Sequence, residues 1–113
     1  MKILVTFRGM EHSNTLEDFV KAKLHKAERF LENEPSPVVI DVILEAALPH
    51  PHHRVEFRLH SPHYKIIANR EGTEIYAEVE AVADIFTQEI ARAKQKRVDE
   101  LKHRSKLSGI DID

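Results

Sequence analysis

Residues 38–60 decide the fold, because they hold two strand-like runs, each with one unbroken apolar face, joined by a short loop. The first run, 38–45, reads VVIDVILE, and its apolar face consists of Val38, Ile40, Val42 and Leu44. The second run, 54–60, reads RVEFRLH and turns Val55, Phe57 and Leu59 inward and Arg54, Glu56, Arg58 and His60 outward. A period of two is typical of strands with one buried face. The pattern therefore predicts two neighbouring antiparallel strands.

On the C-terminal side, the chain continues with a further strand and a long helix. Residues 64–70 alternate, with Tyr64, Ile66 and Ala68 on one side. Thr73 is a suitable N-cap for the helix, whose apolar stripe consists of Ile75, Val79, Val82, Ala83, Phe86, Ile90 and Ala93. The next stripe position is Arg97, so we expect the helix to leave the core near residue 95 and to project into solvent.

On the N-terminal side, residues 2–8 alternate as a strand, with Ile3, Val5 and Phe7 on one face. Ser13 or Asn14 can cap a helix that ends before Pro35 and Pro37. Its apolar positions recur at helical spacing over about five turns, and they are Leu16, Phe19, Val20, Leu24, Ala27, Phe30 and Leu31.

The expected element order is β-α-β-β-β-α, which predicts an α+β fold with a four-stranded mixed sheet and two helices packed on one face. The first two strands flank a helix, and we expect them to be parallel through a right-handed crossover. In this interpretation residues 1–107 form a single domain, and residues 108–113 form a short frayed acidic tail. The residues expected to be most buried are Phe57, Val42, Leu24, Val79 and Phe86.

Composition excludes several classes of function. The 113 residues include no cysteine, which excludes disulfides, zinc–cysteine sites and thiol catalysis and is compatible with a cytoplasmic protein. No segment reaches the roughly 20 apolar residues that cross a bilayer. The few glycines form no phosphate-binding loop, and carboxylates such as Glu74 and Glu78 are best explained as an exposed helix face. We therefore predict that the protein is not an enzyme.

Histidine is frequent in one part of the chain. Five of the eight histidines lie between residues 50 and 63: His50, His52, His53, His60 and His63. A metal site needs ligands that converge on one point, but the sequence places no Asp or Glu to complete such a set. A solvated polar loop is the simpler interpretation, so we predict no metal and no cofactor.

Charge is unevenly distributed, although the net charge is only −2. Residues 73–89 carry five acidic residues and no Lys or Arg, whereas residues 90–106 carry seven Lys or Arg. A basic patch can bind nucleic acid on a molecule that is acidic overall. Basic residues near a helix C-terminus are equally typical of a solvated helix, so charge alone leaves both interpretations open.

Two segments together resemble a known family. Residues 16–30 read LEDFVKAKLHKAERF and are similar to the family's KL.KLERF helix, and residues 74–82 read EIYAEVEAV and are similar to its DMYAAIDxL signature. The basic run 92–96, RAKQK, lies where the family has alternating lysines. With these motifs in this order, roughly residues 2–104 resemble the ribosome hibernation promoting factor and ribosome-associated inhibitor family.

The resemblance implies a cytoplasmic protein of stressed or stationary cells that binds the small ribosomal subunit and its ribosomal RNA at the decoding centre and inhibits translation. It implies no cofactor, no small-molecule substrate and no membrane partner. Ile85 and Gln88 stand at positions that are commonly basic in the family, and Glu89 adds an acid. These departures keep open an alternative, a protein-interaction module on the same fold that has lost ribosome binding. Carried over by motif position, the expected RNA-binding residues are Lys23, Lys26, Arg92, Lys94 and Lys96.

Overall fold

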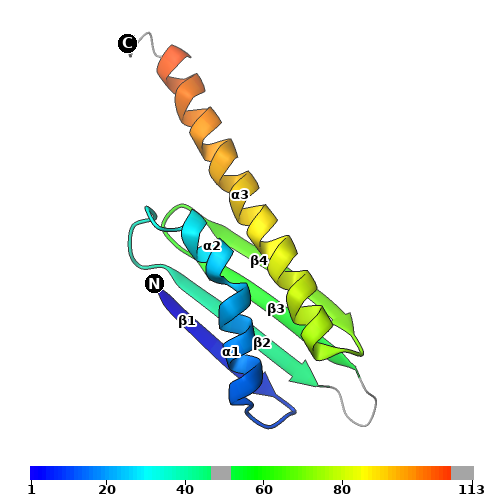
Figure 1. The fold of residues 1–113 in the computed structure, drawn as a ribbon. Helices are drawn as coiled ribbons and strands as arrows, with labels where there is room; N and C mark the ends of the chain where they lie inside the picture. Colours follow the sequence, from blue (N-terminus) through cyan, green and yellow to red (C-terminus); the bar gives the residue numbers. More distant parts are fainter. Residues whose placement is uncertain (47–51, 108–113) are drawn as a thin grey trace.

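The structure of the chain is a computed structural model that describes residues 1–46 and 52–107. It contains the predicted succession of strands and helices (Figure 1), with the first helix divided in two: β1 (Lys2–Arg8), α1 (Asn14–Lys23), α2 (His25–Phe30), β2 (Val39–Ala46), β3 (His53–His60), β4 (Lys65–Gly72) and α3 (Ile75–Leu107). The predicted α+β fold is confirmed. The predicted tail, 108–113, and His50 lie outside the described residues.

The four strands form one sheet in the order β1-β2-β3-β4. β1 and β2 are parallel, whereas β3 is antiparallel to both β2 and β4. This register places apolar residues in rows across the sheet, one of which consists of Val5, Val42, Phe57 and Ala68. All three helices lie over one face of the sheet, with α1 and α2 beside α3 (Figure 1). The helices therefore pack against the face of the sheet that carries these apolar rows.

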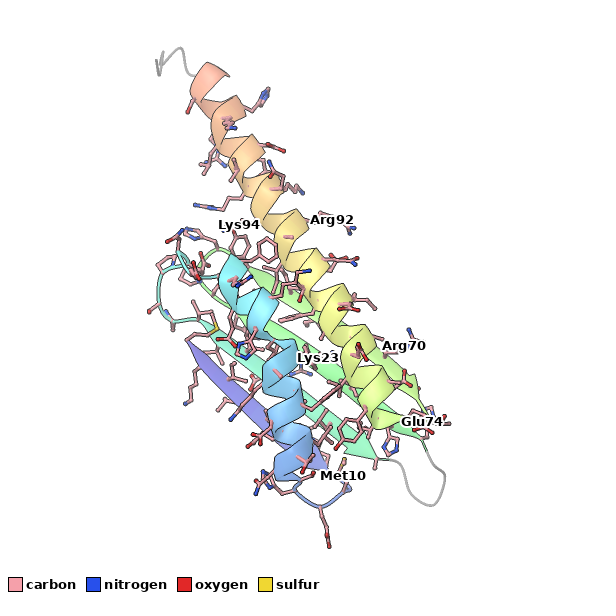
Figure 2. All side chains as sticks on the ribbon, viewed as in Figure 1. Met10, Lys23, Arg70, Glu74, Arg92 and Lys94 are labelled. Atoms are coloured by element: carbon pink, nitrogen blue, oxygen red, sulfur yellow. The ribbon has the colours of Figure 1, made fainter. Side chains whose placement is uncertain are left out.

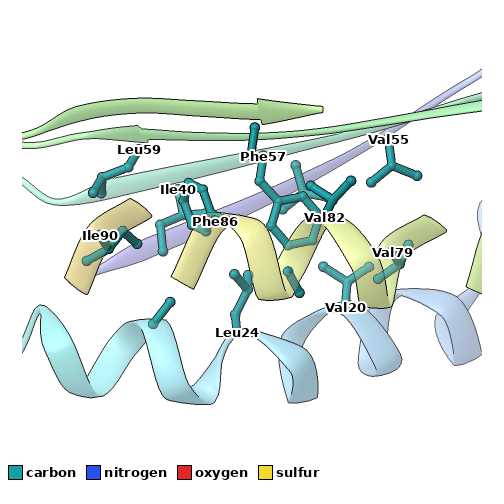
Figure 3. Close-up of a cluster of buried hydrophobic side chains, with 14 of the residues drawn as sticks. Val20, Leu24, Ile40, Val55, Phe57, Leu59, Val79, Val82, Phe86 and Ile90 are labelled. Atoms are coloured by element: carbon teal, nitrogen blue, oxygen red, sulfur yellow. The ribbon is translucent and has the colours of Figure 1, made fainter. Parts of the chain in front are cut away.

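The core lies between the sheet and the helices (Figure 3). Phe57 on β3 and Phe86 on α3 meet edge to face, with ring centroids 5.5 Å apart. Such aromatic pairs add stability beyond the area that they bury. All five residues that the sequence predicted to be most buried have no exposed surface: Phe57, Val42, Leu24, Val79 and Phe86.

The helix predicted after Ser13 is two helices, because the backbone tightens at Leu24. The Leu24 amide is shared between the carbonyl oxygens of Val20 (3.1 Å) and Lys21 (3.2 Å), which is the pattern of a 3₁₀ turn. Leu24 is itself buried, so the apolar stripe continues across the break. At the start of α1, Ser13 Oγ accepts a hydrogen bond from the Leu16 amide at 3.2 Å, which makes Ser13 the N-cap.

The long helix α3 begins one residue later than predicted, at Ile75. The Glu78 amide donates to the Glu74 carbonyl at 2.9 Å, so Glu74 occupies the cap position. The prediction of Thr73 as N-cap is wrong, because β4 extends to Gly72 and leaves Thr73 in the connection. Ile90 is the last residue of α3 in the buried core, a few residues before the exit predicted near residue 95. The helix then projects away from the sheet, as predicted, and the molecule extends to 62 × 22 × 17 Å (Figure 1). Residues 91–107 of α3 are called the stem below.

Two carboxylates expected in solvent are buried instead. Glu56 lies on the sheet face without helices and is only 5% exposed, because Arg54 and Arg58 flank it at 3.2 Å and 2.6 Å. Glu78 on α3 is 8% exposed. It bonds Arg70 Nε at 2.9 Å and packs over Gly72, where an added Cβ would lie 2.2 Å from Glu78 Oε2. Both carboxylates are therefore parts of the packing.

Candidate nucleic-acid interface

The five predicted RNA-binding residues do not form one continuous patch. Lys23 ends α1 and Lys26 begins α2, whereas the other three belong to the stem. Figure 2 shows Arg92 and Lys94 projecting to opposite sides of α3. The predicted set therefore divides into residues that face α1 and α2 and residues on the far side of the stem.

Lys94 has a structural partner. Its half-buried side chain donates from Nζ to the carbonyl oxygen of Phe30 at 3.0 Å. Phe30 is the last residue of α2, and the final carbonyl groups of a helix lack partners within that helix. Lys94 supplies one such partner and ties the end of α2 to the start of the stem.

Lys23 is also engaged within the chain. Its Nζ lies 3.2 Å from Glu80 Oε1 on α3 and 5.3 Å from the centroid of the Phe19 ring. Phe19 in turn meets Tyr76 edge to face, with centroids 5.0 Å apart. Lys23 therefore belongs to a row of contacts that joins α1 to the first half of α3.

Lys26 is exposed and lies beside a shallow depression between α2 and α3, which is called the helix groove below. No ion pair within 4.0 Å holds Lys26 among residues 1–46 and 52–107. The Thr87 hydroxyl in this groove already donates to the Ala83 carbonyl at 2.8 Å. Lys26 is therefore available to an anionic partner. The residues that line the helix groove are Lys26, Phe30, Asp84, Thr87, Gln88 and Ala91.

Arg92 and Lys96 lie on the other side of the stem, along a second depression whose further lining residues include two acids as well as basic groups: Asp99, Glu100, His103 and Arg104. Arg92 Nη1 lies 3.0 Å from Glu89 Oε1, one turn earlier on the same helix. Lys96 makes no ion pair with any described residue. Of the five predicted contacts, Lys26 and Lys96 are thus the two whose side chains form neither an ion pair nor a hydrogen bond with any described residue.

A cluster that sequence reasoning missed lies where α2 leads into β2. The side chain of Glu34 is only 4% exposed and accepts hydrogen bonds from Ser61 Oγ and from the His63 amide at 2.9 Å, while His63 Nδ1 lies 2.7 Å away. Burial raises the pKa of Glu34, but these hydrogen bonds and the charge of His63 outweigh it and hold the pKa below its ordinary value. No sequence pattern links residues so far apart.

Tyr64 extends the same cluster toward the stem. Burial raises the pKa of Tyr64, the negative charge of Glu34 raises it further, and Arg97 on the stem opposes the shift. The carboxylate and the phenol therefore share one electrostatic environment with the base of the stem. This arrangement fixes the loop before β2 against the turn between β3 and β4.

The histidines do not converge on a metal site in the part of the chain that the structure describes. His52 pairs with Glu71 at 3.0 Å, His63 pairs with Glu34, and no group of three or more potential ligands is present among the described residues. Within the same residues, no helix combines the length and the apolar character needed to cross a bilayer.

Comparisons with known proteins agree with this architecture. The family described as Sigma 54 modulation protein / S30EA ribosomal protein matches residues 3–98. A ribosome hibernation promoting factor from Azotobacter vinelandii is 22% identical over 99 residues, which cover 88% of each chain.

Two solved structures share the fold. The Protein Y N-terminal domain from Thermus thermophilus superimposes with a TM-score of 0.65 and 20% identity, covering 81% of this chain and 98% of that one. A ribosomal subunit interface protein from Coxiella burnetii gives a TM-score of 0.67 and 20% identity, covering 84% of this chain and 99% of that one.

Proposed function

Because the chain belongs to the Sigma 54 modulation protein / S30EA ribosomal protein family, we propose that it is a ribosome-associated translation inhibitor that binds the small ribosomal subunit. The family match over residues 3–98 is the observation that carries this proposal. The similarity along 88% of a protein named ribosome hibernation promoting factor supports it. The proposed setting is the cytoplasm of stressed or stationary cells, as the family resemblance implies.

The proposed mechanism is occupation of the decoding centre, without any chemical step. Folded RNA can be bound through its phosphates and its shape without reading its sequence. Lys26 in the helix groove and Lys96 on the stem are exposed and uncompensated, so they are the first candidates for phosphate contacts. Lys23 and Arg92 join them when their carboxylate partners are displaced. Lys94 contributes by holding α2 against the stem.

Co-sedimentation with purified small ribosomal subunits across a salt series tests the proposal. The variant Lys26→Ala/Arg92→Ala/Lys96→Ala should bind more weakly than the native chain, and its affinity should depend less steeply on salt. Each phosphate that a cation neutralises releases counterions, so each lost contact lowers the slope of log affinity against log salt by about one unit at most. Equal affinities and equal slopes would refute these residues as RNA contacts.

A matched control comes from the face of the sheet without helices. Lys2, Arg8 and Lys65 are exposed there, and Lys2→Ala/Arg8→Ala/Lys65→Ala removes the same charge. This control should retain most of the native affinity. If it weakens binding as much as the first variant, binding reflects net charge and the proposed contact surface is wrong.

The second candidate function is a protein-interaction module that has lost ribosome binding. The observation in its favour is Ile85 on α3, whose apolar side chain is exposed. The family resemblance implies that this position is commonly basic. Absence of subunit binding by the native chain at low salt would favour this candidate. Binding that weakens steeply with salt would exclude it.

A further inference from the structure

Two of the proposed RNA contacts are already occupied by carboxylates of the same chain. Glu80 holds Lys23 at 3.2 Å, and Glu89 holds Arg92 at 3.0 Å. Both carboxylates belong to α3, and the two cations lie on different elements and on different sides of it. A single helix thus places an internal anion against one cation of each proposed RNA-binding surface.

We infer that Glu80 and Glu89 act as internal competitors of RNA phosphates, occupying Lys23 and Arg92 until a polyanion displaces them. This inference rests on the proposed function and deepens it, because it assigns the regulation of affinity to two named carboxylates. Carboxylate and phosphate oxygens accept the same charge-assisted hydrogen bonds from ammonium and guanidinium groups. Only one of them can hold a given hydrogen-bonding group at a time.

The exposure of the two acids distinguishes them from the structural carboxylates of the chain. The side chains of Glu80 and Glu89 are 57% and 45% exposed. Ion pairs at this level of exposure contribute little to stability and exchange readily. In contrast, the carboxylates of Glu56 and Glu78 are buried and paired with arginines. Removal of an arginine would leave a buried carboxylate charge without a partner, so these pairs are not readily displaced. Glu80 and Glu89 therefore have the properties of displaceable partners.

The surroundings of Lys23 restrict where its ammonium can go once it is released. The Lys23 Nζ lies near the ring of Phe19, and Lys23, Lys26 and Asp84 line one depression on the helix side of the molecule. The released ammonium would remain in this depression, beside Lys26. Loss of the Glu80 charge should therefore create a pair of neighbouring cations that suits a phosphate.

The test compares two double variants with identical net charge. Glu80→Gln/Glu89→Gln releases both cations. Asp18→Asn/Glu74→Gln removes two exposed acids that form no ion pair with any described residue, and Figure 2 shows Glu74 at the start of α3, well separated from Arg92. The first variant should bind small subunits about 3- to 10-fold more tightly than the native chain, as expected for two weak surface pairs. The second should change affinity by less than about twofold.

A double-mutant cycle tests whether the gain in subunit affinity comes from the release of Lys23 by Glu80. Lys23→Gln should weaken subunit binding more in the Glu80→Gln background than in the native chain, because only there is the ammonium free to bind phosphate. Equal tightening by the two charge-matched variants, or an additive cycle, would overturn the inference. Thermal melting of each variant confirms that it is folded.

Retention on heparin separates this inference from the proposed function. Heparin is a polyanion that lacks the folded structure of ribosomal RNA, so retention on it reports the available positive charge. Glu80→Gln/Glu89→Gln should therefore elute at higher salt than Asp18→Asn/Glu74→Gln, whether or not the protein binds ribosomes. Identical elution of the two variants would refute the release of cations. A difference on heparin with no binding of any variant to small subunits would uphold internal competition and refute the ribosomal function.

Discussion

The two halves of α3 differ in what surrounds them. Residues 75–90 lie against the sheet and bury Val79, Val82, Phe86 and Ile90. The stem has no sheet beneath it, and two of its large apolar side chains, Val98 and Leu101, are exposed. The same helical backbone therefore serves as a core element in one half and as a projecting surface in the other. Stability should come from the first half, and the second half is free to carry residues chosen for binding.

The largest expected effect lies in the buried half. Phe86→Ala should lower the free energy of unfolding by about 3–5 kcal/mol, because it removes the aromatic contact with Phe57 and leaves a cavity. Chemical denaturation monitored by circular dichroism measures this change. A variant that unfolds like the native chain would show that the first half of α3 does not form part of the core.

The second effect concerns the cluster around Glu34, outside α3, which extends through Tyr64 toward Arg97 of the stem. Glu34→Gln should destabilise the chain by about 1–3 kcal/mol at neutral pH, because the buried hydrogen bonds from Ser61 and His63 lose their charged acceptor. Denaturation of the native chain and of Glu34→Gln at pH 7 measures the difference. A loss as small as that of an exposed acid such as Glu74→Gln would contradict the role of this cluster.

The same pair of proteins yields a pH dependence. The folded-state pKa of Glu34 lies below its ordinary value of 4.5, so the folded state binds the proton less readily than the unfolded state does. The stability that the carboxylate contributes is complete above pH 4.5 and is lost as the pH falls through the lowered folded-state pKa. The difference between the native chain and Glu34→Gln should therefore narrow in acid, and a difference that stays constant to pH 3 would contradict this.

The third effect separates two neighbouring lysines of the stem. Lys94→Met should cost about 0.5–1.5 kcal/mol of stability, because the Phe30 carbonyl loses its hydrogen bond, whereas Lys96→Met should cost less than about 0.5 kcal/mol. Subunit binding should show the opposite order. Equal stability of the two variants would mean that Lys94 does not join α2 to the stem.

The smallest effect is expected at the free surface of the stem. Leu101→Ala should change the free energy of unfolding by less than about 0.5 kcal/mol, since it removes no buried contact. Phe86→Ala and Leu101→Ala both replace a large apolar side chain of α3 with Ala, so the difference between them measures the effect of burial. A loss above about 2 kcal/mol would indicate that Leu101 is buried in solution, in a dimer for example, and sedimentation equilibrium of the native chain would detect that state.

Local patterning was sufficient to predict the strands and the core. The alternation in residues 54–60 and the unbroken apolar face of residues 38–45 define the inward side of these strands without reference to any other part of the chain. The break at Leu24 was missed because the apolar spacing continues through it. The burial of Glu56 and Glu78 was missed for a different reason, since their arginine partners become neighbours only once the register of the sheet and the position of α3 are fixed.

The candidate site shows the same limit. The sequence supplied a set of cations, and two of them, Lys26 and Lys96, are exposed. It could not indicate that Lys23 pairs with Glu80 or that Lys94 bonds Phe30, because residues 57 and 64 positions apart are brought together by helix packing. The availability of a charge is thus a tertiary property, even when its presence is plain in the sequence.

The continuity of α3 also has a mechanical consequence. The helix has 33 residues without interruption, which corresponds to a rod of about 50 Å. The first half of this helix is held by packing in the core. The hydrogen bond between Lys94 and the Phe30 carbonyl lies near the point where the helix leaves the core. A force applied at the tip is therefore transmitted as torque to the contact between Phe57 and Phe86. A binding surface that contacts both the tip of the stem and the sheet must present its two contact areas at the separation that the length of this helix sets.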